Sequence, residues 1–88
     1  MIVAYSKTAL SYLQRLDQKT KKRIFEATQN LPVKGDIIKM KSQKIQNIYR
    51  LRVGSYRIIF QMEKDLIKIL DIAPRGEAYK GKFGGRHT

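Results

Sequence analysis

Residues 48–62 read IYRLRVGSYRIIFQM, in which two runs of β-branched and aromatic residues flank Gly54 and Ser55. Alternating runs of this kind around a two-residue pair containing glycine are typical of two antiparallel strands joined by a tight turn. Successive side chains of a strand point to opposite faces of the sheet. The stretch therefore predicts a β-hairpin with one apolar row on each strand.

Three arginines share one face of this hairpin if its two apolar rows pack on a common core. These are Arg50, Arg52 and Arg57. Like charges placed opposite each other destabilise a sheet, so the arrangement indicates an anion with several oxygens, such as a phosphodiester backbone. The other interpretation is that the arginines of the first strand form the solvated face of an edge hairpin. The residues alone leave both interpretations open.

The charge of the whole chain also points to an anionic partner. The chain has 88 residues, with 19 Lys+Arg against 7 Asp+Glu, and a formal net charge of +12. This length allows one small domain. A charge so far from balance favours a polyanion, either nucleic acid or an acidic protein, and charge alone does not separate these two.

Composition excludes several other classes of protein. The chain has no cysteine, which rules out a disulfide framework and a thiolate zinc site. The sequence shows no carboxylate pair or metal-ligand cluster, so we expect no metal and no cofactor. No apolar run reaches the length of a membrane span and the N-terminus lacks a secretory signal, so we expect a cytoplasmic protein.

The N-terminal third predicts a strand followed by two helices. Residues 1–5 are apolar and β-branched, and Ser6 can cap a helix whose apolar spacing ends near Leu16. Asp17 is a second N-cap candidate, for a longer helix that stops at Pro32. Four basic residues lie on the outer face of this second helix, and we interpret them as a solvated surface rather than as a nucleic-acid contact: Lys19, Lys21, Lys22 and Arg23.

The segment between the second helix and the hairpin, residues 33–47, predicts a loop. A short extended piece is expected at 37–40, where β-branched residues gather. Lys39 and Lys41 could border the basic face of the sheet, and we expect them to contact RNA phosphates.

After the hairpin, a polar turn at 63–65 leads to a last strand at 66–73, which Pro74 ends. The order of elements is strand, helix, helix, strand, strand, strand. It predicts an α+β fold in which two N-terminal helices pack on one face of a small, mostly antiparallel sheet and leave the arginine face open. We expect residues 1–80 to form the single domain and the basic, glycine-rich residues 81–88 to form a flexible tail.

Three parts of the chain resemble the RelE/ParE superfamily of toxins from bacterial type II toxin–antitoxin pairs. They are Gly35-Asp36-Ile37 followed by a basic loop, the string YRLRVGSYRIIF at 49–60, and Arg75-Gly76-Glu77-Ala78-Tyr79 after the last strand. The Gly-x-Tyr-Arg core of the central string is quite specific, and the Arg-x-x-x-Tyr ending adds independent support. The resemblance covers roughly residues 2–80 and is closest to RelE-like mRNA interferases.

This resemblance implies a RelE-like two-layer fold and a toxin that acts on translation. RelE-like enzymes are compact basic endoribonucleases that enter the ribosomal A site and cleave messenger RNA there without a metal, by attack of the 2′-hydroxyl group. An antitoxin protein wraps and neutralises them. For this chain the resemblance therefore implies a ribosome-dependent mRNA interferase that arrests growth. It also implies a cognate antitoxin, with a toxin that is monomeric alone and hetero-oligomeric with its partner.

The resemblance implies that the catalytic residues of RelE-like enzymes match five positions: Arg50, Arg52, Arg57, Arg75 and Tyr79. Of these we assign Arg57, Arg75 and Tyr79 to catalysis, and Arg50 and Arg52 to binding of the RNA backbone. We add Lys80, with the two loop lysines named above, as an RNA contact. Clustered arginines stabilise the charge that builds on the phosphate oxygens, and one such donor is worth roughly 10²–10³ in rate.

The general base is left open by the sequence. RelE-like enzymes carry lysines where this chain has Arg50 and Arg52, and a guanidinium group stays protonated at ordinary pH, so it cannot accept a proton. Tyr79 could accept the 2′ proton in strongly positive surroundings, or it could stack on a base. His87 is the only histidine and lies in the C-terminal tail, so we interpret it as incidental.

Two other functions stay open. A ParE-like toxin has the same fold but poisons DNA gyrase by protein contact and needs no nuclease site. A plain RNA-binding module would use the basic sheet without catalysis. Both kinds of toxin should arrest growth on expression, whereas a binding module should not.

Overall fold

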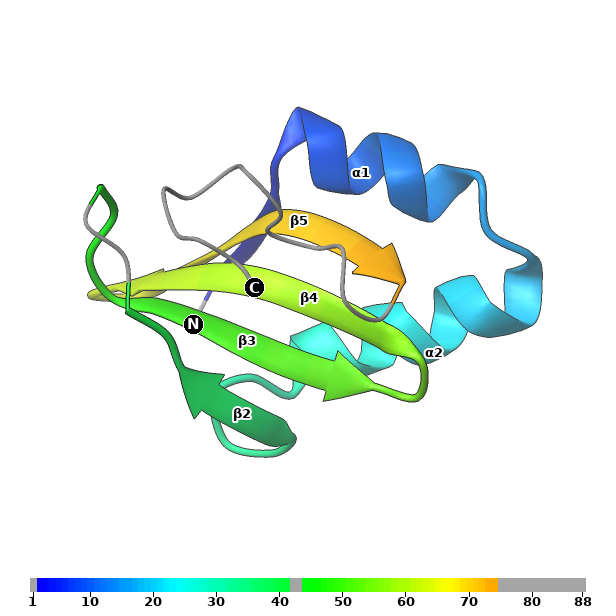
Figure 1. Cartoon of the computed structure of the whole chain (residues 1–88). Helices are drawn as coiled ribbons and strands as arrows, with labels where there is room; N and C mark the ends of the chain where they lie inside the picture. Colours follow the sequence, from blue (N-terminus) through cyan, green and yellow to red (C-terminus); the bar gives the residue numbers. More distant parts are fainter. Residues whose placement is uncertain (1, 42–43, 75–88) are drawn as a thin grey trace.

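The computed structural model describes residues 2–41 and 44–74, which form one five-stranded sheet and two helices (Figure 1). In chain order the elements are β1 (Ile2–Tyr5), α1 (Lys7–Gln14), α2 (Gln18–Gln29), β2 (Asp36–Lys39), β3 (Ile48–Val53), β4 (Tyr56–Glu63) and β5 (Leu66–Pro74). The strands lie in the order β1-β5-β4-β3-β2, with β1 parallel to β5 and the other neighbours antiparallel. The predicted α+β fold is confirmed, and the extended piece expected before the hairpin is the edge strand β2.

Both helices begin at the caps that the sequence predicts. Ser6 Oγ accepts a hydrogen bond from the Ala9 N–H at 3.0 Å, and Asp17 Oδ2 accepts one from the Thr20 N–H at 3.1 Å. These side chains satisfy backbone donors that have no partner in the first turn of a helix. Hydrogen bonds from Thr20 hold the pKa of the Asp17 carboxyl below its ordinary value. Ser6 Oγ also donates to the Leu70 carbonyl oxygen at 2.8 Å, which ties the start of α1 to β5.

The central hairpin forms from β3 and β4 as predicted. Leu51 lies opposite Ile58, and Arg52 lies opposite Arg57. Gly54 begins the turn with φ +60°, a conformation that residues with a Cβ atom rarely adopt. This glycine lets the chain reverse within two residues, so the facing rows of the two strands stay in register.

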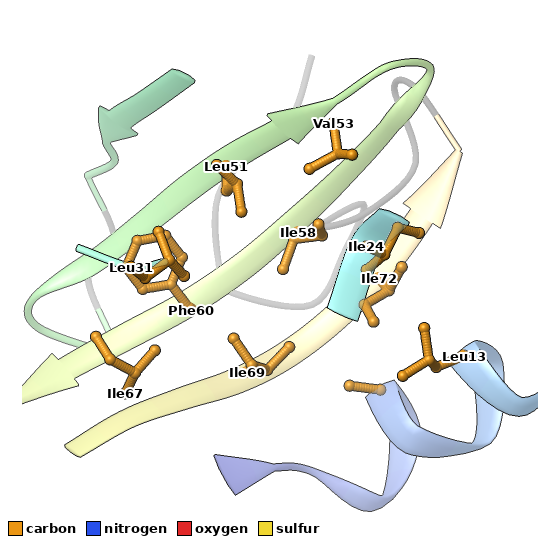
Figure 2. Close-up of a cluster of buried hydrophobic side chains, with 11 residues drawn as sticks. Leu13, Ile24, Leu31, Leu51, Val53, Ile58, Phe60, Ile67, Ile69 and Ile72 are labelled. Atoms are coloured by element: carbon orange, nitrogen blue, oxygen red, sulfur yellow. The ribbon is translucent and has the colours of Figure 1, made fainter. Parts of the chain in front are cut away.

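The main core lies between the helices and one face of the sheet (Figure 2). Its buried side chains come from the helical layer, the hairpin and β5: Ala9, Leu13, Ile24, Leu31, Leu51, Val53, Ile58, Phe60, Ile67, Ile69 and Ile72. Tyr49 stacks on Phe60 with ring centroids 5.5 Å apart. Full burial of one large apolar side chain contributes about 1.5–3 kcal/mol. This layer therefore supplies the main stabilisation and supports the hairpin beneath its polar face.

The arginine face is partly covered, which differs from the open face that the sequence predicts. Ile48 and Ile59 lie on that face and are buried, and four partly buried side chains pack against them: Met40, Ile45, Leu70 and Ala73. The segment before β3 is held to β4 here, because Gln61 Nε2 donates to the Gln46 carbonyl oxygen at 3.1 Å. The face therefore has an apolar end at the start of β3 and an arginine end at the hairpin turn.

A β-bulge in β5 determines which side chains of this strand lie on the arginine face. Ile59 lies opposite Asp71 and Phe60 lies opposite Ile69, so Leu70 is an extra residue without a register partner. An extra residue shifts the alternation of side chains between the two faces. As a result Ile69 contributes to the helix-side core, while Leu70 and Asp71 both belong to the arginine face.

Candidate phosphate-binding site

The hairpin brings two arginines directly opposite each other. Arg52 of β3 pairs with Arg57 of β4, and Arg50 lies two residues before Arg52 on the same face. Side chains directly opposite in an antiparallel pair have Cβ atoms about 4.5–5.5 Å apart. Two guanidinium groups at such positions repel each other unless negative charge lies near them. The shared face predicted for the three arginines is therefore present.

A pocket lies at this end of the hairpin. It is lined by Arg52, Gly54, Ser55, Tyr56 and Arg57 and has a volume of about 260 Å³. A water molecule occupies roughly 30 Å³ in the liquid, so the pocket is large enough for a phosphate group. The guanidinium groups and the serine hydroxyl that line it are donors that suit an oxyanion.

Arg57 is the more buried arginine of the facing pair. Its Nε atom is buried and has no hydrogen-bond partner among residues 2–41 and 44–74. An unsatisfied buried donor costs about 1–3 kcal/mol, and more when the group is charged. Native proteins leave few such groups, and each calls for an explanation such as a ligand or a catalytic role. Arg57 is therefore the best single indicator of a functional site on this face.

Arg52 forms an ion pair with an acidic residue of the edge strand β2. Asp36 lies opposite Arg52 in the register, and Asp36 Oδ2 lies 2.8 Å from Arg52 Nη2. The side chains are 60% exposed for Arg52 and 49% for Asp36, so the pair contributes at most about 1 kcal/mol. Its main effect is to orient Arg52, whose guanidinium group keeps further N–H donors for a ligand.

Asp71 is a buried carboxylate on the same face that the sequence pattern did not single out. It is 7% exposed and lies opposite Ile59, two residues along β4 from Arg57. Its Oδ1 accepts a hydrogen bond from the Ile72 N–H at 3.0 Å. Burial of a carboxylate is costly without hydrogen-bonding or positive neighbours, so Asp71 adds a balancing charge beside the arginines. The signal in the sequence is one acidic residue within an otherwise apolar strand.

The two loop lysines do not line the arginine pocket. Lys39 lies opposite Tyr49, which packs against the helix-side core, so the register places Lys39 on the helix side of the edge strand. Ile38 takes the arginine side, opposite Arg50. Lys39 and Lys41 both line a separate hollow of about 490 Å³. RNA contact by either lysine stays a prediction.

Three predicted site residues, Arg75, Tyr79 and Lys80, lie outside the described residues. The last strand ends at Pro74, which is opposite Tyr56 of the arginine pocket. Pro74 immediately precedes Arg75 in the sequence. The roles of these three residues stay predictions.

Residues 2–41 and 44–74 contain no group of three or more His, Cys, Asp or Glu side chains that could hold a metal ion. Within these residues, neither helix has the length and apolar character needed to cross a membrane. The donors that the site does offer are guanidinium groups and a hydroxyl, which bind oxyanions.

Two helices on one face of a five-stranded sheet, with basic side chains at the tip of the central hairpin, define the RelE-like class of α+β fold. A family model described as "ParE toxin of type II toxin-antitoxin system, parDE" matches residues 3–79. The chain belongs to this family, within the RelE/ParE superfamily of type II toxin–antitoxin toxins. The superfamily expected from the sequence is confirmed.

Solved structures of RelE–RelB complexes and of a YoeB dimer share the fold. The archaeal RelE–RelB complex from Pyrococcus horikoshii OT3 matches with 30% identity over 88% of this chain and 97% of that chain, at a TM-score of 0.69. The RelB–RelE antitoxin–toxin complex from Methanococcus jannaschii matches with 31% identity, coverage of 81% and 88%, and a TM-score of 0.63. The YoeB dimer from Staphylococcus aureus matches with 25% identity over 80% of this chain and 91% of that chain, at a TM-score of 0.62. Among curated protein sequences no match is found.

Proposed function

We propose that this toxin is an endoribonuclease that cleaves messenger RNA in the ribosomal A site and thereby inhibits translation. The observation that carries the proposal is the facing pair of Arg52 and Arg57 at a phosphate-sized pocket, with an unpaired buried donor on Arg57. The similarity to RelE and YoeB proteins supports an activity of the RelE type.

The proposed reaction is an attack within the RNA chain. The 2′-oxygen forms a bond to the adjacent phosphorus while the bond from phosphorus to the 5′-oxygen breaks, which gives a 2′,3′-cyclic phosphate and a 5′-hydroxyl end. Negative charge increases on the non-bridging oxygens in the transition state. Arg57 and Arg52 bind these oxygens, and preorganised donors of this kind contribute most of the catalytic effect in many enzymes.

Proton transfer requires a group other than the described arginines. One proton must leave the 2′-hydroxyl and one must reach the 5′-oxygen, and a guanidinium group cannot accept the first. We propose that Tyr79 accepts the proton of the 2′-hydroxyl group. The variant Tyr79→Phe keeps the ring and removes the hydroxyl, so it should retain RNA stacking and lose cleavage; cleavage at the unchanged rate would refute the role.

We further propose an acidic antitoxin as the partner of this chain. The RelE proteins of Pyrococcus horikoshii and Methanococcus jannaschii are solved in complex with RelB. A net charge of +12 favours a partner that carries acidic side chains. Binding of such a partner over the arginine pocket would block access of RNA.

The second candidate function is inhibition of DNA gyrase. The family model that matches this chain is the one described for the ParE toxin, which favours this alternative. A gyrase inhibitor acts by protein contact, so Arg52 and Arg57 would then form part of a binding surface rather than a catalytic site.

Primer extension on messenger RNA in a purified translation system separates the two candidates. New ends within codons should appear with the wild-type toxin and disappear with the Arg57→Ala, Arg75→Ala double variant. Lys64→Ala is the control, because Lys64 is exposed in the turn between β4 and β5 at the other end of the sheet. Uninterrupted translation without new ends, together with loss of supercoiling by purified gyrase, would favour the second candidate.

A further inference from the structure

A third guanidinium group from the helical layer reaches the tip of the central hairpin. A Cβ atom placed on Gly54 would lie 3.0 Å from both Nη1 and Nη2 of Arg23 and 3.2 Å from its Cζ. The guanidinium group of Arg23 therefore covers Gly54 at close range, and Figure 1 shows α2 passing behind the β3–β4 turn. Gly54 also lines the pocket of Arg52 and Arg57.

Arg23 differs in this respect from the other basic residues of α2. Lys19, Lys21 and Lys22 line a separate hollow whose apolar wall includes Leu13 and Phe25. Lys19, Lys22 and Arg23 are exposed, in agreement with the interpretation as a solvated surface. Arg23 in addition lies against the hairpin turn at Gly54, although it is far from the turn in the sequence.

No carboxylate in the described part of the chain balances Arg23. Its side chain is exposed, and the two ion pairs found among residues 2–41 and 44–74 join Arg52 to Asp36 and Lys68 to Glu63. A guanidinium group against the turn of the hairpin that carries Arg52 and Arg57 adds to the positive potential of the tip. Such an arrangement suits a polyanion that passes over the turn.

We propose that Arg23 extends the RNA site around the hairpin tip, where it binds the phosphate next to the one held by Arg52 and Arg57. This inference rests on the proposed ribonuclease function and names a further contact of the same site. A protein groove that follows a single strand carries positive groups at successive positions along the backbone. Gly54 has two roles in this site, because its positive φ makes the turn and its missing Cβ leaves room for the guanidinium group.

Salt dependence of RNA binding tests the contact. The probe is a fluorescein-labelled single-stranded RNA of about ten nucleotides, measured by anisotropy with the purified full chain across a series of salt concentrations. Loss of one phosphate contact makes the slope of log K against log salt less negative by about 0.7 for a single strand. Arg23→Ala should show this change. Lys22→Ala is the matched control, since it removes one charge from the same helix and should leave the slope unchanged.

A second variant tests the role of Gly54 without changing Arg23. Asparagine tolerates positive φ, so Gly54→Asn should keep the turn, but its Cβ would lie 3.0 Å from Nη1 and Nη2 of Arg23, so the guanidinium group has to shift. The variant should make the slope less negative by a smaller amount than Arg23→Ala does. Adding Gly54→Asn to Arg23→Ala should produce no further change, because the guanidinium group is then already absent.

The outcomes distinguish this inference from the proposed function. Wild-type slopes in both Arg23→Ala and Gly54→Asn, with RNA bound normally, would overturn the role of Arg23 and leave the ribonuclease proposal intact. A wild-type chain that does not bind the free RNA would overturn the Arg23 contact, whereas the ribonuclease proposal is overturned only by the absence of new ends in the primer-extension experiment. Loss of binding confined to a poly-L-glutamate probe would assign the tip to an acidic protein and contradict the RNA contact.

Discussion

Arg57 combines three features that point to function at the scale of a single residue. It faces another arginine, it is partly buried, and its Nε has no partner in the described part of the chain. Each feature costs stability when no anion is bound. A bound anion would relieve all three costs, so Arg57 is the side chain that most strongly indicates a ligand.

The geometry of the Arg57 guanidinium group should matter beyond its charge. A lysine at this position keeps the charge and loses the planar fork that binds two phosphate oxygens. We expect Arg57→Lys to lower single-turnover cleavage on programmed ribosomes by roughly 10²-fold, the low end of the loss of one transition-state donor. Circular dichroism and the thermal midpoint should match the wild type, and cleavage within twofold of the wild type would contradict the role.

Asp71 should contribute to stability through its hydrogen bond. Asp71→Ala removes the acceptor of the Ile72 N–H in a buried setting, and an unsatisfied buried donor costs about 1–3 kcal/mol. Asp71→Asn keeps an Oδ1 acceptor, so it should cost less than the alanine variant. Urea unfolding measures both variants, and equal losses would show that the charge of Asp71, not this hydrogen bond, carries its contribution.

At the scale of single elements, α1 (Lys7–Gln14) depends on its N-cap residue, Ser6, for two contacts. Ser6 Oγ accepts from the Ala9 N–H and donates to the Leu70 carbonyl oxygen. Ser6→Ala removes both and should lower the free energy of unfolding by about 1–2 kcal/mol. Ser11→Ala is the control, because Ser11 is exposed in the middle of the same helix and alanine is the better helix former there. A loss in Ser11→Ala equal to that in Ser6→Ala would exclude the cap as the cause.

The elements that the sequence predicts correctly are those specified by neighbouring residues. The hairpin follows from alternation around Gly54, and the helix starts follow from Ser6 and Asp17, whose capping hydrogen bonds come from backbone N–H groups three residues ahead. The β-bulge at Leu70 has no such local pattern. It changes which side chains of β5 face the arginines, so the buried position of Asp71 could not be read from strand alternation.

At the scale of the whole molecule, the net charge of +12 should make the folded state sensitive to salt. Self-repulsion of like charges destabilises a compact protein, and the screening length falls from about 30 Å at 0.01 M to about 8 Å at 0.15 M. We expect the thermal midpoint to rise with sodium chloride over this range. A Lys22→Gln, Lys64→Gln variant should show a smaller rise, and a midpoint that falls with salt would contradict the explanation.

The contacts that could not be predicted from the sequence join segments that are distant along the chain. Arg23 meets the turn at Gly54 across about thirty residues, and the apolar cluster on the arginine face brings Met40 and Ile45 against β3, β4 and β5. Such contacts depend on how the layers pack, which no local periodicity specifies. The arginine pair was predictable because one hairpin carries both members. The complete basic tip was not predictable, because α2 supplies part of it.

The parallel pairing of the first and last described strands has a consequence for synthesis. Ile2 lies in register with Leu66, and β1 has β5 as its sheet neighbour. β1 leaves the exit tunnel before β5, but it can join the sheet only after β5 has emerged, since β5 lies between β1 and β4. A nascent chain holds an incomplete sheet until residue 74 has emerged.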